Sequence, residues 1–103
     1  MEDKYWQIII ENFAQLDLLQ IVDWYELERN GLSNSFLDDF EEALNKIKRN
    51  PFYASKINER TRGASFNRFP YQIIYTIDAE KLKIYVLVIT HQHRKPFWYK
   101  DRK

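Results

Sequence analysis

The sequence predicts an α+β domain in which a helical hairpin packs on one face of a largely antiparallel sheet, with elements in the order β-α-α-β-β-β. Two segments in the first half have apolar residues at helical spacing, and Asn30-Gly31 separates them. Two segments in the second half are rich in β-branched and aromatic residues, and a short polar turn joins them. Helices followed by a run of strands are typical of α+β folds.

The chain has 103 residues, which suits one domain with a modest core, so we predict a single domain over residues 1–103. It has no cysteine, which excludes a disulfide framework and thiolate chemistry and is compatible with a cytoplasmic location. Acidic residues come first and the first apolar run is short. We therefore expect neither a signal peptide nor a membrane span.

The first strand is predicted over Lys4 to Ile10, a short β-branched and aromatic run. A helix follows, with Asn12 placed to cap it and Gln15 at its third position. Asn30-Gly31 ends this helix because glycine readily takes the left-handed conformation at a helix end. We expect Trp24 to pack in the core or between the helices. The apolar face comprises Ala14, Leu18, Ile21, Val22 and Tyr25.

The second helix is predicted to begin near Ser33 or Ser35 and to end at Asn50-Pro51, since the residue before a proline disfavours helix. A short loop between two helices predicts an antiparallel hairpin. The apolar stripe comprises Phe36, Phe40, Ala43, Leu44 and Ile47. The acids expected to face water are Asp38, Asp39, Glu41 and Glu42.

Three strands are predicted in the second half. Thr61 to Phe69 is a weak strand that Pro70 interrupts, and Tyr71 to Ile77 is a strong one. After the turn at residues 78–81, Leu82 to Thr90 is apolar on both faces, which predicts a central strand covered on each side. If the weak strand is regular, one side of it carries Arg62, Ala64, Phe66 and Arg68.

Charge is distributed unevenly along the chain. Residues 1–50 hold five Lys/Arg against eleven Asp/Glu, a net charge of −6, and residues 51–103 hold eleven against four, a net charge of +7. The last thirteen residues alone contain two histidines, five Lys/Arg and three aromatic residues. The basic half is consistent with an acidic partner such as nucleic acid or an acidic peptide. It is also consistent with exposed sheet edge and tail.

The ordered set of motifs resembles the RelE/ParE superfamily, the toxins of bacterial type II toxin–antitoxin systems, often labelled plasmid stabilisation proteins. The matching pieces are "IVDWYE", "FLDDFEEALNKIKRNP", "RFPYQIIYTID" and "THQHRKPFWYK", in this order from Lys4 to Lys100. The resemblance implies a toxin that inhibits growth and a RelE/ParE-like fold. It also implies a cognate antitoxin, of which a disordered segment wraps around the toxin as a helix or an added strand. A toxin–antitoxin hetero-oligomer is the expected assembly.

RelE-like members of the superfamily cleave mRNA in the ribosome without a metal or other cofactor, using the 2′-hydroxyl of the RNA. Such chemistry needs arginines aimed at the developing phosphate charge and a group that moves a proton. The resemblance implies five candidate catalytic residues: Arg68, His91, His93, Arg94 and Tyr99. It implies four candidate RNA- or antitoxin-binding residues: Arg62, Lys95, Trp98 and Lys100. A sheet face that gathers Arg62, Arg68, His91 and Arg94 would hold a scissile phosphate.

The sequence departs from the RelE pattern before the sheet arginine, where lysines are replaced by Ala64, Ser65 and Phe66. The closing pattern His-x-x-Arg-x-Pro-x-Trp, at residues 91–98, looks more like the ParE branch. ParE-like members share the fold, lack the nuclease residues and inhibit DNA gyrase. Three hypotheses therefore stand: a ribosome-dependent mRNA endoribonuclease, a non-enzymatic gyrase inhibitor, and a degenerate toxin that only binds its antitoxin.

Each candidate also has a structural explanation. His91 fits a hydrogen-bonded structural histidine, and Arg62 and Arg68 fit solvated edge-strand charges that oppose aggregation. The His91-x-His93 spacing suits zinc, but no third ligand is near in sequence, so we expect no metal site. The aromatic residues 97–99 either stack on bases or fold back over the sheet.

Overall fold

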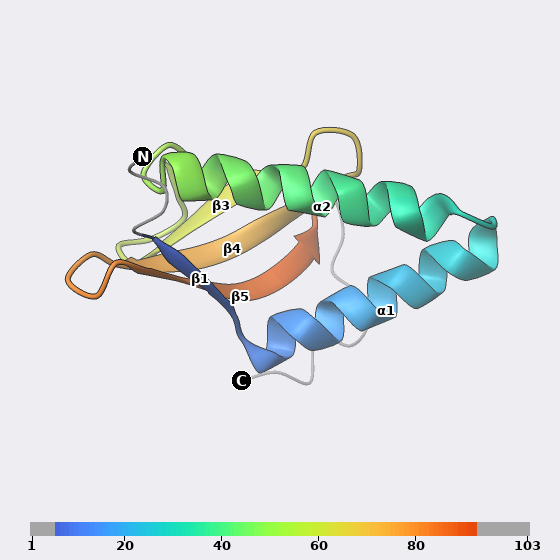
Figure 1. Ribbon diagram of the computed structural model, residues 1–103, viewed down its shortest axis with the longest axis horizontal. Helices are drawn as coiled ribbons and strands as arrows, with labels where there is room; N and C mark the ends of the chain where they lie inside the picture. The colour runs from blue at the N-terminus through green and yellow to red at the C-terminus, as the bar shows by residue number, and fades with distance from the viewer. Residues whose placement is uncertain (1–5, 93–103) are drawn as a thin grey trace.

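The computed structural model describes residues 6–92, which form two helices on one face of a five-stranded sheet (Figure 1). The helices are α1 (Asn12–Glu28) and α2 (Leu32–Arg49). The strands are β1 (Gln7–Ile10), β2 (Ser55–Lys56), β3 (Thr61–Ser65), β4 (Tyr71–Asp78) and β5 (Lys83–His91). The predicted α+β class and the helical hairpin on the sheet are confirmed. The two-residue strand β2 was not predicted.

The sheet has the order β1-β5-β4-β3-β2, and only β1 is parallel to its neighbour, with Ile8 opposite Ile84. The strands β2 to β5 form an antiparallel meander. The central position predicted for β5 is confirmed. Its predicted cover on both sides is not, because both helices of the described chain lie on one face of the sheet.

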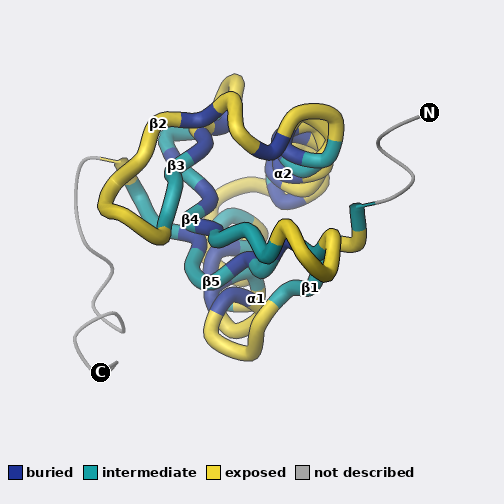
Figure 2. The backbone as a smooth tube through the Cα atoms, turned by 90° about the vertical axis from the view of Figure 1, so that its left-hand side faces the viewer, coloured by how far each residue is buried: buried dark blue, intermediate teal, exposed yellow. Residues whose placement is uncertain are grey.

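The core lies between the sheet and the helices. On β4 the alternate residues Tyr71, Ile73 and Tyr75 are buried, as the two-residue period of a strand requires. On β5 an extra residue, Leu87, interrupts the pairing opposite Ile74 and Tyr75. This bulge allows Val86 and Ile89 both to face the helices although they are three residues apart. Figure 2 shows the buried segments gathered where the sheet meets α1 and α2.

The helix ends differ in detail from the prediction. Glu11 is the N-cap of α1 and makes no side-chain cap, and Asn12 is already helical. The amide Nε2 of Gln15 instead donates to the carbonyl of Ile10 at 2.8 Å, which ties the first turn of α1 to the end of β1. Gly31 has a φ of +86°, so the residue predicted to end α1 is also the N-cap of α2.

Tyr75 gives the fold a testable response to alkaline pH. Its hydroxyl donates to the carbonyl of Pro51 at 2.6 Å, and the residue is fully buried. Burial, reinforced by Tyr53 and opposed by Arg62, raises the pKa of Tyr75 from 10.0 to about 12. The unfolded chain therefore loses this proton first. The stability that the protonated Tyr75 contributes to the folded protein is complete below about pH 10. It is lost as the pH rises toward 12, by about 1.4 kcal/mol per pH unit.

Urea unfolding between about pH 8 and pH 11.5 measures this slope. We expect Tyr75→Phe to be about 1 kcal/mol less stable near pH 8, because one hydrogen bond is lost. Above pH 10 the variant should lose stability more slowly than the parent protein. Equal slopes for the two proteins would show that Tyr75 does not carry the effect.

Candidate functional site

The loop between β3 and β4 carries Arg68 and is anchored to α2 by a buried aspartate. Oδ2 of Asp39 accepts hydrogen bonds from the backbone N–H groups of Arg68 and Phe69, both at 2.8 Å. The side chain of Arg68 is 60% exposed, and its Nε lies 3.9 Å from Oδ1 of Asp39. The backbone of Arg68 is thus held in place while its guanidinium remains accessible to a partner.

Asp39 was predicted to face water, and this prediction is wrong. Its side chain is fully buried, and among the described residues its Oδ1 has no hydrogen-bond partner. The strand β3 ends at Ser65, so the N–H groups of the loop that follows have no acceptor on a neighbouring strand. The Asp39 carboxylate supplies that acceptor for Arg68 and Phe69. For the same reason, Arg68 does not continue the strand face on which Arg62 lies.

His91 ends β5 and lies at the same end of the sheet as Arg68. It is paired with Tyr71, and the two rings meet edge to face with centroids 5.1 Å apart. Tyr71 belongs to an aromatic cluster beneath the helical hairpin, and the expected packing of Tyr25 is confirmed there. The other members are Phe36, Phe40, Phe66 and Phe69. The expectation that Trp24 packs in the core or between the helices is wrong, since Trp24 is exposed on α1. The imidazole of His91 therefore sits at the border of the core, next to a buried phenol.

Arg62 lies apart from these two residues. It is opposite Tyr75, four residues along β4 from Tyr71, which is about 13 Å in a strand. Its Nη1 donates to the carbonyls of Ala54 at 2.7 Å and Phe52 at 3.1 Å, and its guanidinium lies 5.4 Å from the centre of the Phe52 ring. These contacts hold the connection between α2 and β2. The predicted convergence of Arg62 with Arg68 and His91 is not found.

The sheet face turned away from the helices carries no cation over its middle, as far as the described residues go. The register and the strand alternation place neutral side chains there. The Gln72 amide packs over Gly63 on this face: a Cβ added at Gly63 would lie only 2.7 Å from Oε1 of Gln72. Between the strand ends, the side chains on this face of β4 and β5 are Gln72, Ile74, Thr76, Tyr85, Val88 and Thr90, and the charged pair Asp78 and Lys83 lies only where the two strands meet their turn. Their chemistry suits contact with a protein surface better than binding of a phosphate.

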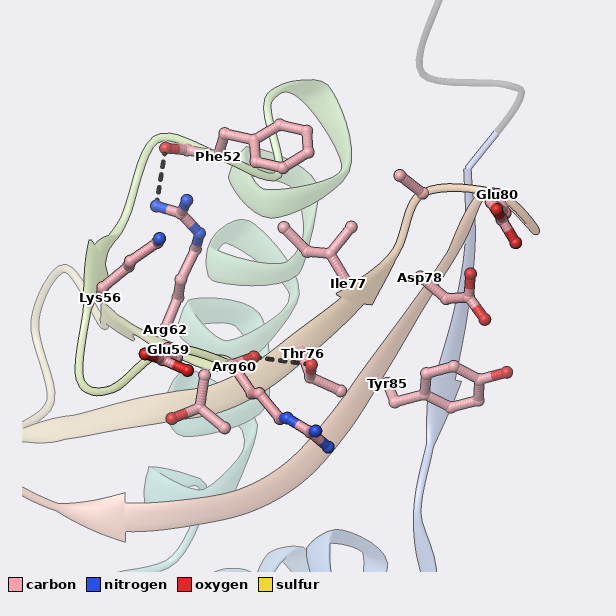
Figure 3. Close-up of a pocket in the computed structure, with 12 residues that line it drawn as sticks. Phe52, Lys56, Glu59, Arg60, Arg62, Thr76, Ile77, Asp78, Glu80 and Tyr85 are labelled. Atoms are coloured by element: carbon pink, nitrogen blue, oxygen red, sulfur yellow. Dashed lines mark hydrogen bonds between the residues drawn. The ribbon is translucent and has the colours of Figure 1, made fainter.

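A hollow of about 650 Å³ lies at one end of the sheet (Figure 3). Arg68, in the loop between β3 and β4, lies at the other end. The hollow is formed by the β2–β3 hairpin and by the turn between β4 and β5. Acidic and basic groups are balanced in its lining, with Glu59, Asp78 and Glu80 against Lys56, Arg60 and Arg62. The Thr76 hydroxyl donates a hydrogen bond to the backbone carbonyl of Arg60 at 2.7 Å. Among the described residues that line this hollow, Arg62 is the one predicted site residue.

The remaining predicted residues fall outside the described range of 6–92. They are His93, Arg94, Lys95, Trp98, Tyr99 and Lys100. Within that range, no group of three His, Asp or Glu side chains is placed to bind a metal ion. No helix between residues 6 and 92 is long and apolar enough to cross a membrane.

Asp17 is a functional residue of the fold that was not predicted, although the sequence pattern contains a signal for it. Asp17 lies on the apolar face of α1, three residues after Ala14 and four before Ile21. It is fully buried, and its Oδ2 accepts the backbone N–H of Ile89 at 2.8 Å. An acid on an apolar helix face often marks a carboxylate that accepts buried N–H groups. Asp17 and Asp39 thus bind the sheet from the two helices.

The sequence matches, over residues 8–96, the family described as the ParE toxin of the type II toxin–antitoxin system parDE. The chain belongs to the ParE toxin family. It is therefore a member of the RelE/ParE superfamily, and the expectation drawn from its motifs is confirmed. A search of curated protein sequences finds no significant match.

Solved structures share the fold of this ParE-family toxin at low sequence identity. The chromosomal ParDE system of Pseudomonas aeruginosa has a TM-score of 0.73 at 18% identity, over 84% of this chain and 96% of that one. The RelBE2 complex of Mycobacterium tuberculosis has a TM-score of 0.59 at 19% identity, with coverages of 84% and 96%. The isolated RelE toxin of Escherichia coli has a TM-score of 0.63 at 10% identity, with coverages of 93% and 94%.

Proposed function

We propose that this ParE-family toxin arrests growth by binding DNA gyrase rather than by cutting RNA. The observation that supports the proposal is the neutral sheet face, whose described side chains between the strand ends are amide, hydroxyl, phenol and aliphatic groups. Cleavage through the RNA 2′-hydroxyl requires cations and a proton-transfer group at one point. Arg62, the one arginine on the described strands, donates to two backbone carbonyls instead.

A second candidate is RNA cleavage, and one observation favours it. Arg68 is accessible and lies at the sheet end where the chain continues past His91. In this alternative, Arg68 and Arg94 would stabilise the phosphate charge, and His91, His93 or Tyr99 would transfer the proton. Lys95, Trp98 and Lys100, with Arg62, would contact RNA or antitoxin. The candidate would operate without a metal, as the family resemblance implies.

We also propose that a cognate antitoxin neutralises this toxin in the cytoplasm. Two of the structural neighbours are toxin–antitoxin assemblies, ParDE and RelBE2. The net charge of +7 in residues 51–103 suits an acidic antitoxin segment. Binding of that segment should therefore weaken as salt is added. Binding independent of salt would contradict this part of the proposal.

Expression from a tightly controlled promoter tests the mechanism. We expect growth arrest with a DNA-damage response and intact mRNA, and purified toxin should inhibit gyrase supercoiling. Messenger RNA ends that map inside codons would instead establish cleavage. In that case Arg68→Ala should cut on the order of 10²–10³-fold more slowly. Arg29→Ala, which removes another exposed arginine, is the matched control. Normal growth at confirmed soluble expression would indicate a degenerate toxin.

A further inference from the structure

The hollow beside the β4–β5 turn contains an unpaired piece of strand edge. Strand β3 pairs with β4 only as far as Thr61, which lies opposite Thr76. The next residue of β4, Ile77, lines the hollow. The carbonyl of Arg60 accepts the Thr76 hydroxyl, and among the described residues no backbone hydrogen bond joins Arg60 to Ile77. At Ile77 this edge of β4 therefore has no partner strand.

The backbone N–H and C=O of Ile77 point toward this unpaired side. At the other end of β4, the carbonyl of Tyr71 accepts the N–H of Phe66 from the β3–β4 loop. The backbone groups of a strand turn to alternate sides with a period of two residues. Those of Ile77, six residues after Tyr71, therefore point to the same side of β4. A strand edge that offers one donor and one acceptor is suited to recognise a peptide backbone.

The two walls of the hollow carry opposite charge. Figure 3 shows Lys56 and Arg62 on the side of the β2–β3 hairpin, and Asp78 and Glu80 on the side of the β4–β5 turn. Among the described residues, no ion pair joins the two sides. The charged lining residues of the hairpin are Lys56, Glu59, Arg60 and Arg62, three cations and one acid, and those of the turn are Asp78 and Glu80. A ligand with a negative and a positive end would satisfy both walls.

The direction of the strand edge agrees with this separation of charge. A peptide laid against Ile77 antiparallel to β4 would run in the same direction as β3 and would end next to Thr61. Its C-terminal carboxylate would then face the cations of the hairpin, and its N-terminal ammonium would face the acids of the turn. A peptide in the parallel direction would place each end against like charge. The volume of about 650 Å³ lies in the range of about 300–1,000 Å³ that is usual for small-molecule sites.

We propose that the hollow binds a short free peptide, which pairs with the backbone of Ile77 and uses both of its charged ends. The side chains of Phe52 and Ile77 offer apolar contact to its middle. A polyphosphate would meet the three acids of the lining, and a polyamine would meet the three cations, so each fits less well than a dipolar ligand. The proposal is independent of the toxin's target, because it uses no residue at the Arg68 end of the sheet.

Four forms of the tripeptide Ala-Val-Ala test the proposal: free, acetylated at the N-terminus, amidated at the C-terminus, and blocked at both ends. Each is titrated into the isotope-labelled full chain, and the amide NMR signals are followed. We expect the free form to shift the amides of Ile77 and Ala79 saturably at about 1–10 mM. Blocking either end should weaken binding about three- to fivefold, the effect of losing one exposed charge pair. Added salt should also weaken it.

Variants of the two walls assign the ends of the peptide. Arg60→Gln should weaken the free form about three- to fivefold, and amidation should then have less than about half its effect on the parent protein. Glu80→Gln should do the same for acetylation. Lys81→Gln, which removes a cation of the same turn that does not line the hollow, is the matched control and should bind normally. Circular dichroism and urea unfolding check that each variant is folded.

Three results would overturn the proposal. The first is no saturable shift of Ile77 up to about 50 mM free tripeptide. The second is equal binding of the free and doubly blocked forms, which would assign the hollow to an internal segment of a protein chain. The third is binding that is unchanged in both Arg60→Gln and Glu80→Gln. The gyrase and mRNA measurements are separate, so failure of the tripeptide leaves the proposed mechanism untouched.

Discussion

Replacing Asp39 by alanine is expected to lower the free energy of unfolding by about 3 kcal/mol, because two hydrogen bonds to a charged acceptor are lost at about 1.5 kcal/mol each. Oδ2 of Asp39 accepts the N–H groups of Arg68 and Phe69, and the fully buried side chain excludes water as a substitute. The β3–β4 loop would lose its anchor to α2. Urea unfolding of the variant and the parent protein measures the difference.

Two further substitutions separate the carboxylate from its position. Asp38→Ala removes a neighbouring exposed acid from the same helix and should change stability by less than about 0.5 kcal/mol. Asp39→Asn keeps one oxygen acceptor and should fall between the alanine variant and the parent protein. If Asp39→Ala were as stable as Asp38→Ala, the anchoring role would be wrong.

Replacing Asp17 by alanine should have the second largest effect, a loss of about 2 kcal/mol, since it leaves the N–H of Ile89 buried without its acceptor. The strand β1 pairs with β5 only as far as Val86, and the chain then turns into α1. Beyond Val86, the Asp17 carboxylate on that helix accepts the N–H of Ile89, which has no partner on β1. The anchor therefore couples α1 to the central strand.

Hydrogen exchange at the amide of Ile89 gives a local measure of this anchor. We expect exchange at Ile89 to accelerate in Asp17→Ala more than exchange at Ile84, which lies within the paired part of β5. Asp23→Ala, an exposed acid on the same helix, is the control and should change neither amide. Uniform acceleration across β5 would indicate global destabilisation and would contradict a local anchor.

The sequence predicted the elements well where hydrophobic spacing was strong. The spacing of Phe36, Phe40 and Ile47 placed α2, and the β-branched run from Tyr71 placed β4. It failed for β2, because two residues carry no periodic signal. It also extended β3 to Phe69, since the apolar alternation continues into a loop that Asp39 holds in place.

The candidate site was less predictable than the fold. Arg62 and Arg68 are six residues apart and share a side of an ideal strand, yet the strand ends between them. The Arg62 guanidinium donates hydrogen bonds to the carbonyls of Phe52 and Ala54, and nothing in the local sequence specifies these partners. Likewise, the helical period of α2 places Asp39 beside Phe36 and Ala43, but its burial depends on the β3–β4 loop arriving from about thirty residues away.

By itself, the sequence determined the α+β class, the helical hairpin, the meander and the family, because these follow from periodicity, turn residues and the order of motifs along the chain. The tertiary structure decided that β1 lies parallel to β5, that Asp17 and Asp39 are internal anchors, and that Arg62 and Arg68 are separated. It also left one side of α1 exposed. Local patterns report which side chains prefer burial, whereas the partner that buries or binds each one comes from distant segments that only the folded chain brings together.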